Sequence, residues 1–165
     1  MGRLWDMLTG NGAPSPAQRG RHTPDELHLA AAALLVEAAT VDSNFDADER
    51  GRILAYARDG LGLTAERAKA LIATAEKAVA ESTQLYGFTR VVKSSFSYDE
   101  RVRLIETLWE VVYSDGKADA HEQQLVRRLG DLIYVTDRDR GHARKRVLAR
   151  LEGAGRSPAK PRRPG

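Results

Sequence analysis

A segment of 13 residues occurs twice in the chain, 73 positions apart, and this repeat limits the possible fold more than any other feature. Residues 37–49 align without gaps on residues 110–122. Five positions are identical, four of them acidic: Glu37/Glu110, Asp42/Asp115, Asp46/Asp119, Ala47/Ala120 and Glu49/Glu122. A repeat that served packing alone would preserve apolar residues. The recurring carboxylates therefore mark these two segments as the place to look for function.

Signals for helix starts precede both copies of the repeat. Thr23-Pro-Asp-Glu26 and Ser97-Tyr-Asp-Glu100 each place a hydroxyl at the N-cap and a glutamate three residues later, which is a capping box. Apolar residues then recur at helical spacing. The stripes are Leu27, Ala31, Leu34, Leu35, Ala38 and Val41, and Leu104, Ile105, Leu108, Trp109 and Val112. Further helices are predicted from about residue 64, over 84–95 and over 138–151.

The composition suits helices and offers little material for strands. Alanine, leucine, arginine and glutamate, all good helix formers, dominate the chain, and aromatic residues make up only 6%. We therefore predict an all-α fold, a helical bundle of about seven helices formed from two helix–acidic loop–helix units. Residues 1–22 are predicted to be a short apolar segment with a flexible linker, residues 23–152 the helical domain, and residues 153–165 a basic tail.

Several classes of protein are excluded or disfavoured by what the chain lacks. It has no cysteine, so disulfides, thiolate metal sites and a cysteine nucleophile are excluded. No apolar run approaches the ~18 residues of a membrane span, and the N-terminus does not resemble a signal peptide. No motif of a known catalytic class is found. We expect a cytoplasmic protein with no enzymatic activity.

The net charge of +3 is unevenly distributed. Residues 137–165 carry ten Lys or Arg against three Asp or Glu, whereas residues 1–136 carry 16 basic and 20 acidic residues. A basic end of this kind either keeps the protein soluble or contacts nucleic acid or another anionic surface. The acidic balance of residues 1–136 argues against nucleic acid as the primary partner.

Each repeat reads Asp-x3-Asp-x2-Glu at a predicted junction between two helices. Two interpretations are open. In the first, Asp46 with Glu49, and Asp119 with Glu122, are capping boxes. That leaves Asp42 and Asp115 unexplained. In the second, the three carboxylates of each loop bind a hard divalent cation such as Ca²⁺, Mg²⁺ or Mn²⁺, which prefers oxygen ligands. The candidate metal ligands are Asp42, Asp46, Glu49, Asp115, Asp119 and Glu122. Neither loop has the spacing of an EF-hand.

Residues 39–49 and 112–122 together resemble the TerB family, helical domains associated with tellurite resistance and similar to the N-terminal domain of a DnaJ-like co-chaperone. The likeness covers about residues 25–147. It implies an all-helical bundle, divalent-metal binding at the same six acidic positions, and an association with stress response without established catalysis. The first loop departs from the family pattern because Ser43 stands where the family has glycine, so the second loop is the better candidate.

The apolar residues Leu4, Trp5 and Leu8 form a separate cluster near the N-terminus. They are candidate partner-binding residues, and they could instead dock on their own domain or touch a membrane surface. Docking on the domain is the preferred interpretation. The functional prediction is a non-enzymatic, cation-binding TerB-like protein that acts with an unidentified protein partner. The alternative is an interaction scaffold that needs no metal.

Overall fold

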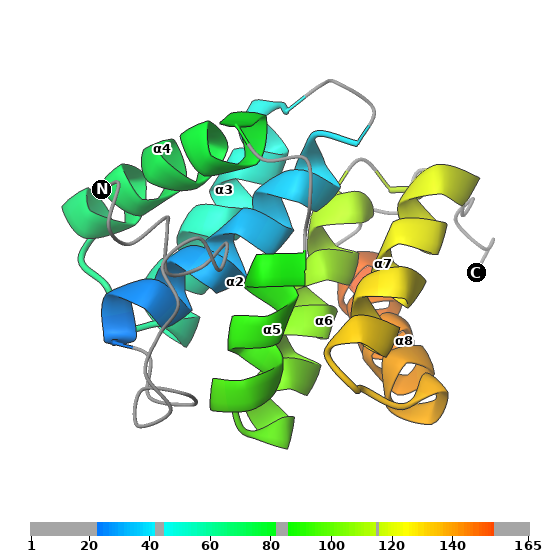
Figure 1. The fold of residues 1–165 in the computed structure, drawn as a ribbon. Helices are drawn as coiled ribbons and strands as arrows, with labels where there is room; N and C mark the ends of the chain where they lie inside the picture. The colour runs from blue at the N-terminus through cyan, green and yellow to red at the C-terminus, as the bar shows by residue number, and fades with distance from the viewer. Residues whose placement is uncertain (1–22, 42–44, 82–85, 115, 154–165) are drawn as a thin grey trace, which may run out of the picture.

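The structure, a computed structural model, describes residues 23–41, 45–81, 86–114 and 116–153. These residues form seven α-helices and one π-helical turn, and no strand (Figure 1). In chain order they are α2 (Pro24–Ala39), α3 (Ala47–Ala55), η2 (Tyr56–Gly60), α4 (Ala65–Glu81), α5 (Tyr86–Ser95), α6 (Tyr98–Val112), α7 (Ala120–Leu132) and α8 (Asp137–Gly153). The predicted all-α bundle of about seven helices is confirmed.

Helix α2 is the centre of the bundle. It contacts α3, α4, α5, α6 and α7, and every residue from Leu29 to Ala39 except Glu37 is buried. The sequence predicted one apolar face, yet the helix is enclosed on nearly all sides. Its run of alanines explains the difference, because small side chains let neighbouring helices approach from several directions.

The other helices are arranged around α2 in three pairs. Helices α3 and α4 lie on one side of it, α5 and α6 lie against it, and α7 and α8 pack at the far side of α6 (Figure 1). The core is mainly aliphatic, and its buried aromatic side chains are Tyr56, Phe88, Phe96, Trp109 and Tyr113. The sequence placed Trp109 on an apolar helical stripe, and its burial confirms that prediction.

The predicted helix starts are found at their expected residues. The Thr23 and Ser97 side chains accept hydrogen bonds from the backbone N–H groups of Glu26 and Glu100, and both glutamates bond back to their caps. Such a cap contributes about 1 kcal/mol. Among the described residues no helix is long and apolar enough to cross a membrane.

Helix α8 was predicted to be a basic helix, and the structure shows what two of its arginines do. Arg144 donates to the Tyr113 hydroxyl at 2.8 Å and lies over the ring of Trp109. Arg150 binds Glu106 and Glu110 at 2.7 and 2.9 Å. Much of the positive charge of this helix is therefore used to hold α8 on α6, which reduces what is available for an anionic partner.

Candidate cation site at the two acidic junctions

The two copies of the repeat form the same kind of junction. Helix α2 ends with Thr40 at its C-cap and α3 begins after the N-cap Asp46, while α6 ends with Tyr113 and α7 begins after Asp119. The two C-caps also share their backbone conformation, with φ, ψ of −102°, 5° at Thr40 and −99°, 14° at Tyr113. Helix ends and helix starts thus coincide at the shift of 73 residues seen in the sequence.

Two carboxylates at each junction are held by reciprocal hydrogen bonds. Asp46 Oδ1 accepts from the Glu49 backbone N–H at 2.8 Å, and Glu49 Oε1 accepts from the Asp46 N–H at 2.9 Å. The corresponding distances for Asp119 and Glu122 are 2.8 and 3.0 Å. Both pairs are therefore complete capping boxes, as the first interpretation predicted. The same bonds fix two acidic side chains at a helix N-terminus, where the helix dipole stabilises negative charge.

The two acids of each pair differ in burial. Glu49 and Glu122 are only 4% and 7% exposed, whereas Asp46 and Asp119 are exposed. Buried glutamates are uncommon unless they have partners, and both have further interactions beyond the cap. Each junction therefore combines an inner carboxylate that belongs to the fold with an outer one that faces solvent.

The first junction is additionally stabilised by aromatic and ionic contacts. The guanidinium of Arg50 lies 4.4 Å from the centroid of the Phe45 ring and binds both carboxylate oxygens of Glu76 on α4 at 3.0 Å. At the equivalent positions of the second junction, Gln123 donates to the backbone oxygen of Ala118 at 2.9 Å. The first loop is thus tied to α4, and the second loop is tied to the first turn of α7.

The remaining acidic positions of the repeat are Asp42 with Asp115, and Glu37 with Glu110. Asp42 and Asp115 lie outside the described residues, so the predicted threefold clusters stay predictions. Within the described part of the chain, no three Asp, Glu or His side chains are close enough to hold a metal ion. Glu37 and Glu110 have different roles, since burial raises the pKa of Glu37 and Glu110 pairs with Arg150.

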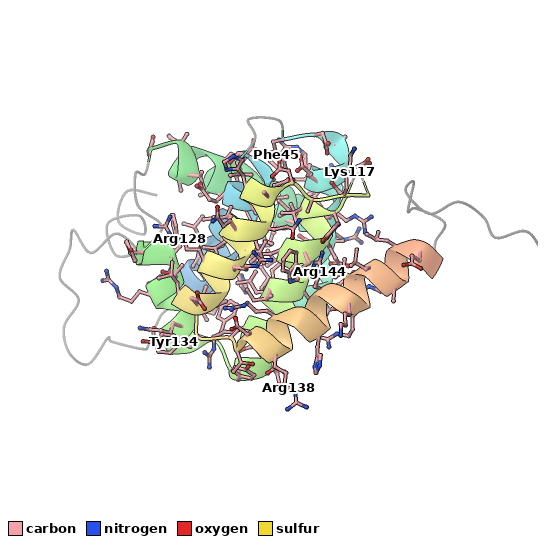
Figure 2. All side chains as sticks on the ribbon, turned by 90° about the vertical axis from the view of Figure 1, so that its right-hand side faces the viewer. Phe45, Lys117, Arg128, Tyr134, Arg138 and Arg144 are labelled. Carbon is pink, nitrogen blue, oxygen red and sulfur yellow. The ribbon has the colours of Figure 1, made fainter. Side chains whose placement is uncertain are left out.

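The second loop contains the glycine turn that its sequence led us to expect. Gly116 has a φ of +97°, a conformation that glycine adopts easily, and its N–H donates to the Tyr113 oxygen at 2.8 Å. The corresponding Ser43 lies outside the described residues. The two junctions lie at the same end of the bundle, the upper end in both views, where Phe45 and Lys117 mark them (Figure 2).

The donor set at each junction suits a hard divalent cation in its chemistry, because it consists of carboxylate oxygens. The outer aspartates use one oxygen for the cap, which leaves the other directed away from the capping bond. Two carboxylates do not fill the 6 to 8 positions around Ca²⁺. The capped aspartate and glutamate of each junction are therefore suitable ligands for such a cation. Further protein ligands would have to include Asp42 or Asp115.

Sequence reasoning missed two grooves that are built from residues far apart in the chain. One, of about 630 Å³, lies between α3, α6 and α8 and is lined by side chains of both charge signs, including Arg52, Asp99 and Glu106. The other, of about 280 Å³, lies between α2 and α4 and has leucine walls. No local pattern predicts such grooves, since each depends on how separate helices pack.

Fold and junctions together define an all-helical protein made of two helix–acidic loop–helix units. The chain belongs to the TerB family: the model of the family described as "Tellurite resistance protein TerB" matches residues 28–145, which include both acidic junctions. The search of curated proteins and the search of solved structures gave no significant match. The resemblance drawn from the sequence is thereby confirmed at the level of the family.

Proposed function

We propose that this TerB-family protein is a non-enzymatic cytoplasmic module that binds a divalent cation at its acidic junctions. The cation would be Ca²⁺, Mg²⁺ or Mn²⁺, and the ligands would come from Asp42, Asp46 and Glu49 or from Asp115, Asp119 and Glu122. One observation carries the proposal: the same aspartate–glutamate pair is held by the same reciprocal bonds at both junctions. Preorganised acidic side chains lower the entropy cost of binding an ion.

The third acid of each loop is what favours a cation over capping alone. Capping accounts for Asp119 and Glu122, and it gives no role to Asp115 four residues before the N-cap. An additional carboxylate near two others is repelled unless positive charge neutralises it. The second junction is the stronger candidate, because Gly116 already supplies a left-handed turn between Asp115 and Asp119.

Binding at this place would act on the geometry of the bundle. Each junction connects two helices that both pack in the core, so an ion that bridges the end of α6 and the start of α7 would fix the angle between them. A protein partner that recognises this end of the bundle would then distinguish the ion-bound junction from the ion-free junction. In this proposal, cation-dependent partner binding, with no catalytic step, underlies the family's association with stress and tellurite resistance.

The experiment is calorimetric titration of the full chain with Ca²⁺, Mg²⁺ and Mn²⁺ in turn, followed by thermal melts. Ion at one hundred times its dissociation constant should raise the free energy of unfolding by about 2.7 kcal/mol. Asp115→Asn should remove most of the heat and the stabilisation. The matched control is Asp48→Asn, which removes a carboxylate from the first turn of α3 at a position that is not acidic in the second repeat.

Two results would refute cation binding. One is the absence of heat and of any melting shift at millimolar cation. The other is an equal loss with Asp48→Asn and Asp115→Asn, which would indicate general charge screening. Either result would leave the alternative function, a protein-interaction scaffold that needs no metal, for which the capping boxes alone explain the junctions.

A further inference from the structure

A groove of about 280 Å³ runs between the first half of α2 and the first half of α4. The apolar part of its lining consists of Leu29, Leu63, Ala70 and Leu71, with Thr74 beside them. Leu29 is buried at the base, Leu63 and Leu71 are half-buried, and Ala70 is exposed. Helices α2 and α4 pack against each other, and the groove lies between them.

Charged residues border this groove and carry both signs. Asp25 on α2 and Arg67 on α4 approach to 3.9 Å, and both side chains are exposed. His28 also lines the groove, and burial lowers its pKa. An apolar floor with one acidic and one basic residue at its edge suits an apolar segment that carries one charge of each sign.

The chain itself supplies such a segment next to the groove. Residues 1–22 precede Thr23, and Thr23 is two positions before Asp25 at the edge of the groove. The apolar residues Leu4, Trp5 and Leu8 include two at helical i, i+4 spacing, and Arg3 and Asp6 beside them carry opposite charges. Leu8 and Thr23 are 15 positions apart, and a flexible chain of that length would span about 21 Å on average, enough to return to the groove.

We propose that residues 3–8 dock in the groove between α2 and α4 of their own chain, with Trp5 as the main apolar contact. Trp is the side chain that gains most from such a site, since it can bury on the order of 200 Å². Arg3 then faces Asp25, and Asp6 faces Arg67. Attachment by a short linker gives the segment an effective concentration of the order of millimolar, which favours it over a second copy in dilute solution.

The test uses acrylamide quenching of tryptophan fluorescence in the full chain. The only other tryptophan, Trp109, is 3% exposed and contributes little quenching, and Trp5→Phe supplies its signal for subtraction. We expect Trp5 to be quenched several-fold less than in a free peptide of residues 1–22. Ala70→Glu puts a charge in the groove at an exposed helical position and should raise the quenching of Trp5 to that of the peptide.

The matched control is Ala80→Glu, which makes the same change at an exposed position of α4 outside the groove and should leave Trp5 protected. Circular dichroism verifies that both variants keep their helix content. Trp5 quenched as freely as the peptide would overturn the proposal, and so would equal effects of the two variants. Protection that is lost on tenfold dilution would show a second copy as the occupant, and protection that needs anionic vesicles would show a membrane. The test is independent of cation binding, so the two proposals fail separately.

Discussion

The side chain of Arg140 occupies the space beside Gly130 that any larger residue would need. A Cβ atom built on Gly130 would lie 2.2 Å from Arg140 Cδ. Gly130 belongs to the last turn of α7, and Arg140 reaches across from α8, where it is 6% exposed. Its guanidinium donates to the Asp131 carboxylate at 2.7 Å and to the Val135 oxygen at 3.2 Å. This contact fixes how α8 lies on α7.

The first prediction is that Gly130→Ala destabilises the protein by roughly 1–3 kcal/mol, the usual cost of forcing extra volume into a packed site. Gly51→Ala in α3 is the matched control, because nothing lies within 4 Å of a Cβ built there. That change should stabilise by roughly 0.5–1 kcal/mol through helix propensity. Urea unfolding measures both values, and a gain in stability from Gly130→Ala would show that Arg140 moves aside at no cost.

The second prediction separates capping from charge at the second junction. In buffer without divalent cations, Asp119→Ala should cost about 1 kcal/mol, since it removes the oxygen that accepts from the Glu122 N–H. Asp119→Asn keeps an acceptor at the same place and should cost a few tenths of a kcal/mol at most. Thermal melts of both variants check this. If Asp119→Asn were as destabilising as Asp119→Ala, the charge itself would be required even without an ion.

The third prediction concerns pH and His28. Burial lowers the pKa of His28 from its usual 6.5, with Arg67 acting in the same direction and Asp25 against it. Between the lowered pKa and 6.5 the unfolded chain binds more protons, so stability falls as the pH drops below 6.5 and is unaffected by this group above it. His28→Gln should flatten the dependence of unfolding free energy on pH in that range. An unchanged slope would assign the dependence to other groups.

Much of the fold follows from local patterns, because capping boxes and helical spacing involve residues close in sequence. Ser97 with Glu100 and Asp119 with Glu122 could be read as helix starts from four letters each. The repeat at a shift of 73 residues predicted that the two junctions would be alike, and their matching caps confirm it. Asp46, Glu49, Asp119 and Glu122 form the helix caps that the sequence predicted. Cation binding at these residues stays a prediction.

What the sequence did not predict depends on tertiary packing. The alanines of α2 indicated a helix, but not that it would be enclosed by five others. The arginines of α8 were counted as surface charge, whereas Arg140 is buried and Arg144 and Arg150 bind side chains of α6 and its C-cap. The sequence did not explain the glycine at position 130 of a helix, whereas the structure shows that the Arg140 side chain packs against it. A charge count cannot tell a solvated arginine from one that packs.

The fourth prediction addresses Tyr134, the only non-glycine residue with positive φ in the described part of the chain. It follows α7 with φ 60°. The two bonds of a Schellman motif are present here: the Tyr134 N–H donates to the Asp131 oxygen at 3.2 Å, and the Val135 N–H donates to the Gly130 oxygen at 2.9 Å. Glycine is usual at this position, since the left-handed conformation costs an L-residue about 1–2 kcal/mol.

Tyr134→Gly should therefore relieve strain, but it also removes a contact. The Lys93 ammonium lies 4.7 Å from the centroid of the Tyr134 ring, and the side chain is 66% exposed, so the cation–π contact contributes about 0.5–1 kcal/mol. The net gain in the natural background should be below 1 kcal/mol, and it should be larger in a Lys93→Ala background, where the contact is already absent. Denaturant unfolding of the four proteins in this cycle gives both numbers. A loss of stability in both backgrounds would mean that packing of the tyrosine ring outweighs the strain of its backbone, and the tyrosine would then be part of the link between α5 and α7.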